Sequence, residues 1–137
     1  MIRLMLIFTA CCSLMACNKI KEKVEEKKAL NFITSGQWKV AGYTKDGVDY
    51  TETFAGYAFQ FKNNNTVDAI KNGDLEITGT WAGDTNAYTI NASFPPGAKH
   101  PLPLLNGLWQ LLAGGDNFTK ARKETNGVIC LLHLERV

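Results

Sequence analysis

The sequence predicts an all-β protein, a small antiparallel up-and-down β-barrel of about eight strands with a short N-terminal helix. From Gly36 onward, apolar and polar residues alternate with a period of two, as expected for strands with one buried and one solvated face. Short turn sequences such as Asn72-Gly73 separate the alternating stretches, and Asn-Gly is a strong signal for a tight hairpin. Hairpins that follow one another along the chain favour a closed barrel, because a sandwich would need a long crossover.

Nine stretches have the composition or the alternation of strands. They are residues 37–43, 48–54, 57–62, 66–71, 74–81, 87–94, 108–113, 117–122 and 128–136. All four prolines of the chain fall between positions 95 and 103. Proline cannot donate a ladder hydrogen bond, so residues 95–107 are predicted to be a loop, with a short helical turn at 102–106.

The first 16 residues are predicted to be a signal peptide. Arg3 precedes an apolar run from Leu4 to Met15, which is shorter than the roughly 20 residues of a membrane-spanning helix. The run ends in Leu14-Met15-Ala16-Cys17, which resembles the lipobox of bacterial lipoproteins. That resemblance implies that Cys17 becomes the first mature residue, carries the palmitate-type lipid and anchors the protein to the membrane. The alternative is an ordinary cleaved signal peptide in which Cys17 is incidental.

A charged segment follows the cysteine. Residues 18–28 are mixed in sign and contain neither glycine nor proline, as expected for a tether between the lipid and the folded domain. Ile20 and Val24 are the only apolar residues in this segment, too few for a coiled coil. Residues 29–35 are more apolar and are predicted to form a short helix that ends at Gly36. The predicted organisation is a signal peptide (1–16), a lipidated charged tether (17–28) and a barrel domain (29–137).

Charge and cysteine content narrow the function classes. Without residues 1–16, the chain has 14 Lys and Arg against 13 Asp and Glu, because Arg3 is lost. This balance argues against a nucleic-acid partner, which requires a basic footprint. Cys11 and Cys12 leave with the signal peptide. If Cys17 is acylated, Cys130 is the remaining thiol, so no disulfide framework is predicted and Cys130 is expected to be a buried apolar residue.

No catalytic or metal-binding motif is recognisable. His100 lies in the proline loop and His133 in the last strand, and neither has a second ligand at metal spacing. There is no Gly-x-Ser-x-Gly elbow and no glycine-rich phosphate loop. Asp46, Asp49 and Glu52 lie close together but do not match an EF-hand loop, so they are interpreted as surface charge. We therefore expect no enzymatic activity, no metal and no cofactor.

Each of the three tryptophans follows a glycine by two residues. The triplets are Gly36-Gln37-Trp38, Gly79-Thr80-Trp81 and Gly107-Leu108-Trp109. Residues two apart on a strand point to the same face. Each glycine is therefore predicted to leave space in which the indole can lie along the barrel wall.

The first triplet also resembles the opening motif of the lipocalins and the wider calycin group, because it starts the first strand after a short helical turn. In that family the Trp closes one end of the barrel and an Arg from the last strand packs on the indole. The resemblance implies that Trp38, with Gly36 beside it, closes the barrel. It implies that Arg136 covers Trp38, since Arg136 shares its strand face with Leu134. Together with the lipobox and tether, the chain resembles the small lipocalin-like lipoproteins of Bacteroidetes-type bacteria.

Two functions then remain open for a cell-envelope lipoprotein, with the outer membrane as the expected location. In the first, the barrel binds a small apolar ligand in an internal cavity. The expected lining residues are Tyr57, Phe59, Phe61, Leu75, Ile77, Trp81, Tyr88 and Ile90. In the second, the barrel is packed solid and binds an envelope protein, as an interaction subunit or inhibitor, through its outer face or loops. Leu102, Leu104 and Leu105 would form an apolar patch if exposed, or a lid if they fold over the barrel mouth.

Overall fold

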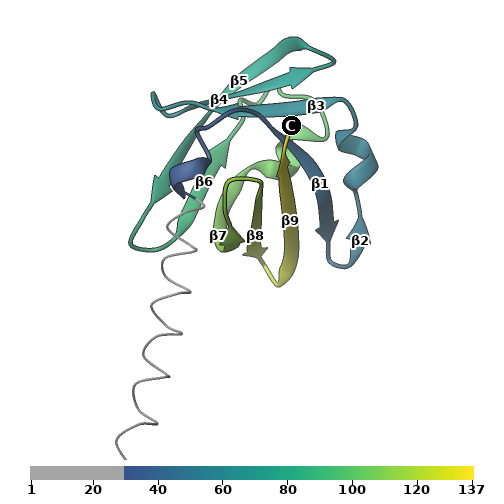
Figure 1. Ribbon diagram of the computed structural model, residues 1–137. Coiled ribbons are helices and arrows are strands. Elements are labelled where there is room, and N and C mark those ends of the chain that lie inside the picture. The colour runs from purple at the N-terminus through teal and green to yellow at the C-terminus, as the bar shows by residue number, and fades with distance from the viewer. Residues whose placement is uncertain (1–29) are drawn as a thin grey trace, which may run out of the picture.

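The computed structural model describes residues 30–137. They form a closed eight-stranded antiparallel up-and-down β-barrel with one short helix (Figure 1). Each strand of the barrel pairs with the next along the chain, and the barrel closes where β1 (Trp38–Lys45) pairs with β9 (Val128–Arg136). The predicted signal peptide and tether, including Cys17, lie outside the described residues. Within residues 30–137, no helix has the length and apolar character needed to cross a membrane.

Between these two strands the wall continues in sequence order. The remaining strands of the barrel are β3 (Tyr57–Phe61), β4 (Thr66–Lys71), β5 (Asp74–Asp84), β6 (Thr89–Ser93), β7 (Gly107–Gly114) and β8 (Phe118–Thr125). β2 (Val48–Asp49) is a two-residue strand that pairs with β1. Single 3-10 turns occupy two of the connections, η1 (Thr51–Phe54) and η2 (Leu102–Leu105), and residues 30–32 form the short helix.

The two neighbours of β1 hold it very differently. β9 pairs with β1 from Trp38↔Arg136 to Lys45↔Cys130, whereas β3 pairs with β1 at Trp38↔Phe59 alone. Beyond that point the space beside β1 is filled by η1. The Phe54 ring packs against Tyr43 and Phe59, with centroid distances of 5.4 and 6.5 Å. Side-chain packing therefore replaces backbone pairing along most of the contact between β1 and β3.

The predicted strand over residues 48–54 is wrong, apart from the two residues of β2. The Asp49 carboxylate accepts hydrogen bonds from the Thr51 backbone N–H at 2.9 Å and from the Thr51 hydroxyl at 2.6 Å. Such local side-chain bonds compete with a strand ladder and turn the chain into η1. The other eight predicted strands are confirmed, with ends within three residues, and the predicted helical turn at 102–106 is η2.

The interior is filled by large side chains from the strands and from the segments that cover the barrel ends. The largest fully buried side chains are Trp38, Tyr43, Phe59, Ile33, Leu102, Leu111 and Val67. Each buried side chain of this kind contributes about 1.5–3 kcal/mol of hydrophobic stabilisation. Ile33 comes from the turn after the N-terminal helix and Leu102 from η2, so both non-strand segments are part of the core.

Candidate functional site

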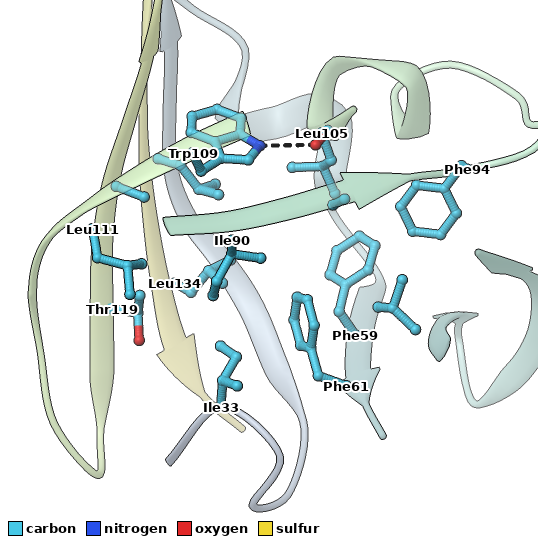
Figure 2. Close-up of a pocket in the computed structure, with 14 residues that line it drawn as sticks. Ile33, Phe59, Phe61, Ile90, Phe94, Leu105, Trp109, Leu111, Thr119 and Leu134 are labelled. Carbon is cyan, nitrogen blue, oxygen red and sulfur yellow. Dashed lines mark hydrogen bonds between the residues drawn. The ribbon is translucent and has the colours of Figure 1, made fainter. Parts of the chain in front are cut away.

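The barrel contains an apolar cavity of about 40 Å³ (Figure 2). Fourteen residues line it, and all except Thr119 are apolar. Pockets for small organic molecules usually measure about 300–1,000 Å³. The cavity is therefore too small for such a ligand and offers room for about two or three water molecules.

Three of the eight residues predicted to line a ligand cavity line the cavity of the structure, and five do not. Phe59, Phe61 and Ile90 line the cavity. Tyr57 is buried but lies outside the lining, and its hydroxyl donates to the Glu76 carboxylate at 2.6 Å. The remaining four also lie outside the lining: Ile77, Trp81 and Tyr88 are partly buried against the core, and Leu75 is exposed.

The expectation that Leu75 faces inward is wrong, since 62% of its surface is exposed. Ile77 pairs with Ala69 on β4, but Leu75 pairs with Ile70, so Glu76 is an extra residue on β5. A β-bulge of this kind shifts the alternation by one residue and turns the following side chains to the other face. Leu75 consequently points to solvent although it lies two residues before Ile77.

Trp81 and Tyr88 are displaced from the interior for local reasons. The Trp81 indole N–H donates to the Lys62 carbonyl at 2.9 Å, and a Cβ added to Gly83 would lie 3.2 Å from the indole Cζ3. The Trp81 ring therefore lies over Gly83, at the rim of the barrel. Tyr88 has a φ of +55° and precedes the first residue of β6, so it does not take part in the alternation of that strand.

Thr119 is the one polar side chain that lines the cavity, and it was not among the predicted residues. Thr119 is 2% exposed, and its hydroxyl has no hydrogen-bond partner within residues 30–137. Figure 2 shows the hydroxyl-bearing side chain near Leu111 on the neighbouring strand β7. The signal that could have found Thr119 is its shared strand face with the buried Ala121.

Replacing Thr119 by valine is expected to raise the free energy of unfolding by about 1 kcal/mol. An unsatisfied buried hydroxyl costs about 1–3 kcal/mol, and valine keeps nearly the same shape without that group. Urea denaturation would measure the change. Thr125→Val on the same strand is the control, because Thr125 is exposed and its replacement should change stability by no more than about 0.5 kcal/mol. A less stable Thr119→Val protein would mean that the hydroxyl is satisfied in solution.

One end of the barrel is closed by Trp38, which is fully buried. Its indole N–H donates to the Ile33 carbonyl at 2.8 Å, and the Arg136 guanidinium lies 5.2 Å from the ring centroid. Arg136 also donates to the Ser35 hydroxyl at 3.2 Å. Gly36 has a φ of +78°, and a Cβ there would lie 3.2 Å from Arg136 Nη1. The structure thus places Gly36, Trp38 and Arg136 in one contact group.

The other end repeats this arrangement with Trp109 and Lys123. The Trp109 indole N–H donates to the Leu105 carbonyl at 2.8 Å, and Lys123 Nζ lies 4.8 Å from the ring centroid. Gly107 has a φ of +126°, and a Cβ there would lie 3.4 Å from Lys123 Cδ. Both tryptophans occur near the starts of their strands, and β1 and β7 run in opposite directions along the barrel axis. The two indoles therefore close opposite ends.

The predicted role of the glycines needs correction. A side chain at Gly36 would meet Arg136, and one at Gly107 would meet Lys123, rather than the tryptophan two residues later. At Gly79, an added Cβ would lie 2.6 Å from the Ser93 carbonyl oxygen and 2.9 Å from Phe94 Cδ1. Each glycine leaves room for a group from another strand, or from the residues that directly follow that other strand. The closed barrel brings this group close to the backbone of the glycine.

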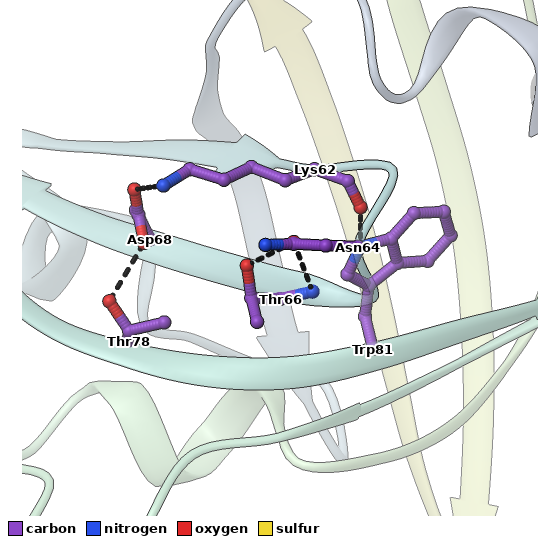
Figure 3. A network of polar contacts seen from close by, with 6 residues as sticks. All are labelled: Lys62, Asn64, Thr66, Asp68, Thr78 and Trp81. Carbon is purple, nitrogen blue, oxygen red and sulfur yellow. Dashed lines mark hydrogen bonds and ion pairs between the residues drawn. The ribbon is translucent and has the colours of Figure 1, made fainter.

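An ion pair between the buried Asp68 on β4 and the partly exposed Lys62 lies outside the cavity. The Asp68 side chain accepts a hydrogen bond from the Thr78 hydroxyl at 2.8 Å and lies 2.6 Å from Lys62 Nζ (Figure 3). Asp68 is 7% exposed. The bond from Lys62 is the main cause that lowers the pKa of the Asp68 carboxyl, and the bond from Thr78 acts in the same direction. This network ties the turn after β3 to β4 and β5.

The Asp68 network is expected to make stability fall at low pH. A lowered folded-state pKa means that the stabilisation is complete above the unfolded pKa of about 3.9 and is lost as the pH falls through the folded pKa. Urea denaturation between neutral and acidic pH would measure this loss. Asp68→Asn should remove this component and flatten the pH profile, whereas Asp74→Asn, at an exposed position, should keep the wild-type profile.

The structure also places the other residues that the sequence singled out. Cys130 is a buried free thiol. Within residues 30–137, no cluster of His, Cys, Asp and Glu side chains could hold a metal ion. His133 packs edge-on against Phe118, with a centroid distance of 6.3 Å. Leu102 and Leu105 are buried and Leu104 is partly buried, so the proline loop covers the barrel mouth and does not form an exposed apolar patch.

Comparisons with known proteins support the fold. No protein-family model and no curated protein matches the chain. The structure is similar to the crystal structure, at 1.00 Å resolution, of a DUF4847 family protein from Bacteroides vulgatus ATCC 8482. The TM-score is 0.52 and the sequence identity is 20%, and the match covers 74% of this chain and 94% of that chain. The chain therefore shares its barrel fold with a DUF4847 family protein from Bacteroides.

Proposed function

We propose that the protein is a cell-envelope lipoprotein whose packed barrel binds a partner protein through its outer surface. The observation that carries this proposal is that the interior is filled, while an open groove lies on the outer surface. The interior cavity measures about 40 Å³, whereas an open groove of about 410 Å³ lies on the outer side of β1 and β7–β9. A filled interior favours a role for the outside of the barrel over a role as a ligand carrier.

The groove has the composition of a protein-binding surface. Leu112 and Leu131 line it and are 50% and 46% exposed, while Lys120 and His133 supply polar groups. Exposed apolar side chains with a polar rim are typical of interaction sites. Two β-bulges border the groove, one in β1 between Val40 and Gly42 and one in β7 next to Leu112. Bulges redirect side chains and are common next to functional surfaces.

A site-specific photo-crosslinker in the membrane-anchored protein tests this role. With the crosslinker at position 131 we expect a discrete adduct with one envelope protein. Position 75 is the matched control, because Leu75 is also an exposed leucine but does not line the groove. Leu131→Asp should weaken binding of the purified partner at least tenfold. No adduct at position 131, or the same adducts at both positions, would contradict the proposal.

The lipid anchor is tested by replacing Cys17 with serine. In a bacterium that processes lipoproteins, the wild-type protein is expected in the membrane fraction and Cys17→Ser in the soluble fraction, because serine cannot accept the thioether-linked lipid. Cys12→Ser is the control and should remain in the membrane fraction, since position 12 lies within the predicted signal peptide. Retention of Cys17→Ser in the membrane would show that the lipobox interpretation is wrong.

Binding of a small apolar ligand inside the barrel is the second candidate function, favoured by the apolar lining and the unpaired Thr119 hydroxyl. The small volume of the cavity makes it the weaker candidate. We expect titration with fatty acids, sterol-like compounds or haem to leave the tryptophan fluorescence unchanged. A saturable change at micromolar ligand, abolished by a substitution that fills the cavity such as Ala92→Phe, would favour this function over the outer-surface role.

A further inference from the structure

We propose that the mouth of the barrel next to Trp109 binds a small organic carboxylate between β1, β8, β9 and η2. A pocket of about 370 Å³ lies there, within the size range of small-molecule sites. Two lysines, Lys45 and Lys123, line the pocket, and none of its described lining residues is acidic. This site is separate from the internal cavity and from the outer groove.

The strand register aligns the two lysines. Cys130 on β9 pairs with Lys45 on β1 and with Lys123 on β8, so the three residues form one row across three strands. Neighbours in such a row have Cβ atoms about 4.5–5.5 Å apart, so the two lysines start on either side of one residue. Neither lysine forms an ion pair with another residue of the segment 30–137. Two cations that flank one residue in this way, neither of them paired with an acidic side chain of the described segment, attract an anion.

Lys123 is held so that its charge stays at the edge of the pocket. The ammonium group donates to the Leu104 carbonyl at 2.9 Å and to the Asn106 carbonyl at 2.6 Å. An ammonium has three donors, and the two carbonyls use two of them. Burial, the largest cause, lowers the pKa of Lys123, and the charge of Lys45 acts in the same direction, whereas Cys130 acts in the opposite direction. A bound carboxylate would offset both unfavourable effects, because it compensates the desolvation and the like-charge repulsion.

The rest of the pocket suits a short apolar chain attached to the carboxylate. Tyr43, Leu104 and Val128 provide apolar surface, while Thr125 and Asn126 provide hydroxyl and amide groups. The Tyr43 hydroxyl is already used, since it donates to the Leu104 carbonyl at 2.5 Å. A compact monocarboxylate such as butyrate matches this combination of two cations and an apolar wall.

Titration of the full-length protein in detergent micelles with butyrate, followed residue by residue by NMR, tests the proposal. We expect saturable shifts of the amides around Lys45, Lys123 and Cys130. Butyramide, which has nearly the same shape without the charge, should bind at least tenfold more weakly. Lys45→Gln should raise the dissociation constant for butyrate about tenfold. Lys39→Gln is the control, because Lys39 is exposed on the same strand and does not line the pocket.

Several results would overturn the carboxylate site. One is the absence of saturable butyrate shifts in these amides. Others are equal affinities for butyrate and butyramide, or an unchanged affinity in Lys45→Gln. Because Lys45 is exposed, its replacement should leave the fold intact, which the unperturbed spectrum of the remaining amides would verify. None of these results depends on the outer groove, so failure of this proposal and failure of the partner-binding role are distinguishable.

Discussion

Replacement of Trp38 by alanine is expected to lower the free energy of unfolding by about 3–5 kcal/mol, as is typical when a large buried aromatic side chain is removed. Trp38 is fully buried and its indole N–H satisfies the Ile33 carbonyl. It also occupies the one position at which β1 pairs with both β3 and β9. Loss of the indole would therefore weaken the closure of the barrel as well as its core. Urea denaturation followed by circular dichroism measures the change.

Two further variants separate the contributions at this end of the barrel. Trp38→Phe keeps an aromatic ring but removes the hydrogen bond to Ile33, so its cost should be smaller than that of the alanine variant. Arg136→Met keeps an extended side chain over the indole and removes the cation, which is expected to cost about 0.5–2 kcal/mol. A cost below about 1 kcal/mol for Trp38→Ala would contradict a closing role for this residue.

Gly79→Ala is expected to destabilise the protein by about 1–3 kcal/mol, although it adds a single methyl group. The added Cβ would lie 2.6 Å from the Ser93 carbonyl oxygen and 3.2 Å from Phe94 Cα. Both of these are backbone atoms, so the clash cannot be relieved by a side-chain rotation. The chain at the end of β6 must shift away from β5, and the cost is measured by urea denaturation.

Gly97→Ala is the matched control for this substitution. A Cβ at Gly97 would meet no atom within 4 Å, and its backbone conformation does not require glycine. Gly97→Ala should therefore leave stability unchanged or raise it slightly, because alanine reduces the freedom of the unfolded chain. Equal effects of the two substitutions would mean that β5 and β6 do not approach closely at Gly79.

The two closed ends suggest why the mouth near Trp109 is the better place for a ligand. At the Trp38 end, the guanidinium of Arg136 bonds to the Ser35 hydroxyl and to the Asp116 carbonyl. At the Trp109 end, Lys123 bonds to two carbonyls and has Lys45 as a neighbour across Cys130. The pocket at the second end is lined by two cations and, within residues 30–137, by no acidic residue, because there the row across β8, β9 and β1 carries lysines.

The strands and their order around the barrel could be predicted from the sequence, because side chains on a strand alternate and turn residues separate the strands. Residues Leu132, Leu134 and Arg136 show this well. Their spacing predicts one shared face, and in the structure the two leucines are buried while Arg136 lies over Trp38. Alternation is a property of each strand by itself, so it is present in the sequence before any tertiary contact forms.

One departure from the predicted strands was decided by the tertiary structure and another by local bonds. Pairing with β4 places a bulge at Glu76 that turns Leu75 outward, whereas the local hydrogen bonds between Asp49 and Thr51 turn a predicted strand into η1. A sequence pattern shows which residues share a face within an unbroken strand, but not where pairing with the neighbouring strand inserts an extra residue. The space filled by Phe54 likewise depends on how far β1 and β3 diverge.

The volume inside the barrel and the grouping of the lysines were also decided by the tertiary structure. The sequence could identify apolar side chains on the inner face, but the cavity of about 40 Å³ depends on how rings from all strands pack together. The row of Lys45, Cys130 and Lys123 depends on the register of β9 with its hairpin partner β8 and with β1, which lies far from both in the chain. Alternation along one strand carries no information on register between strands, so only the closed barrel brings these residues together.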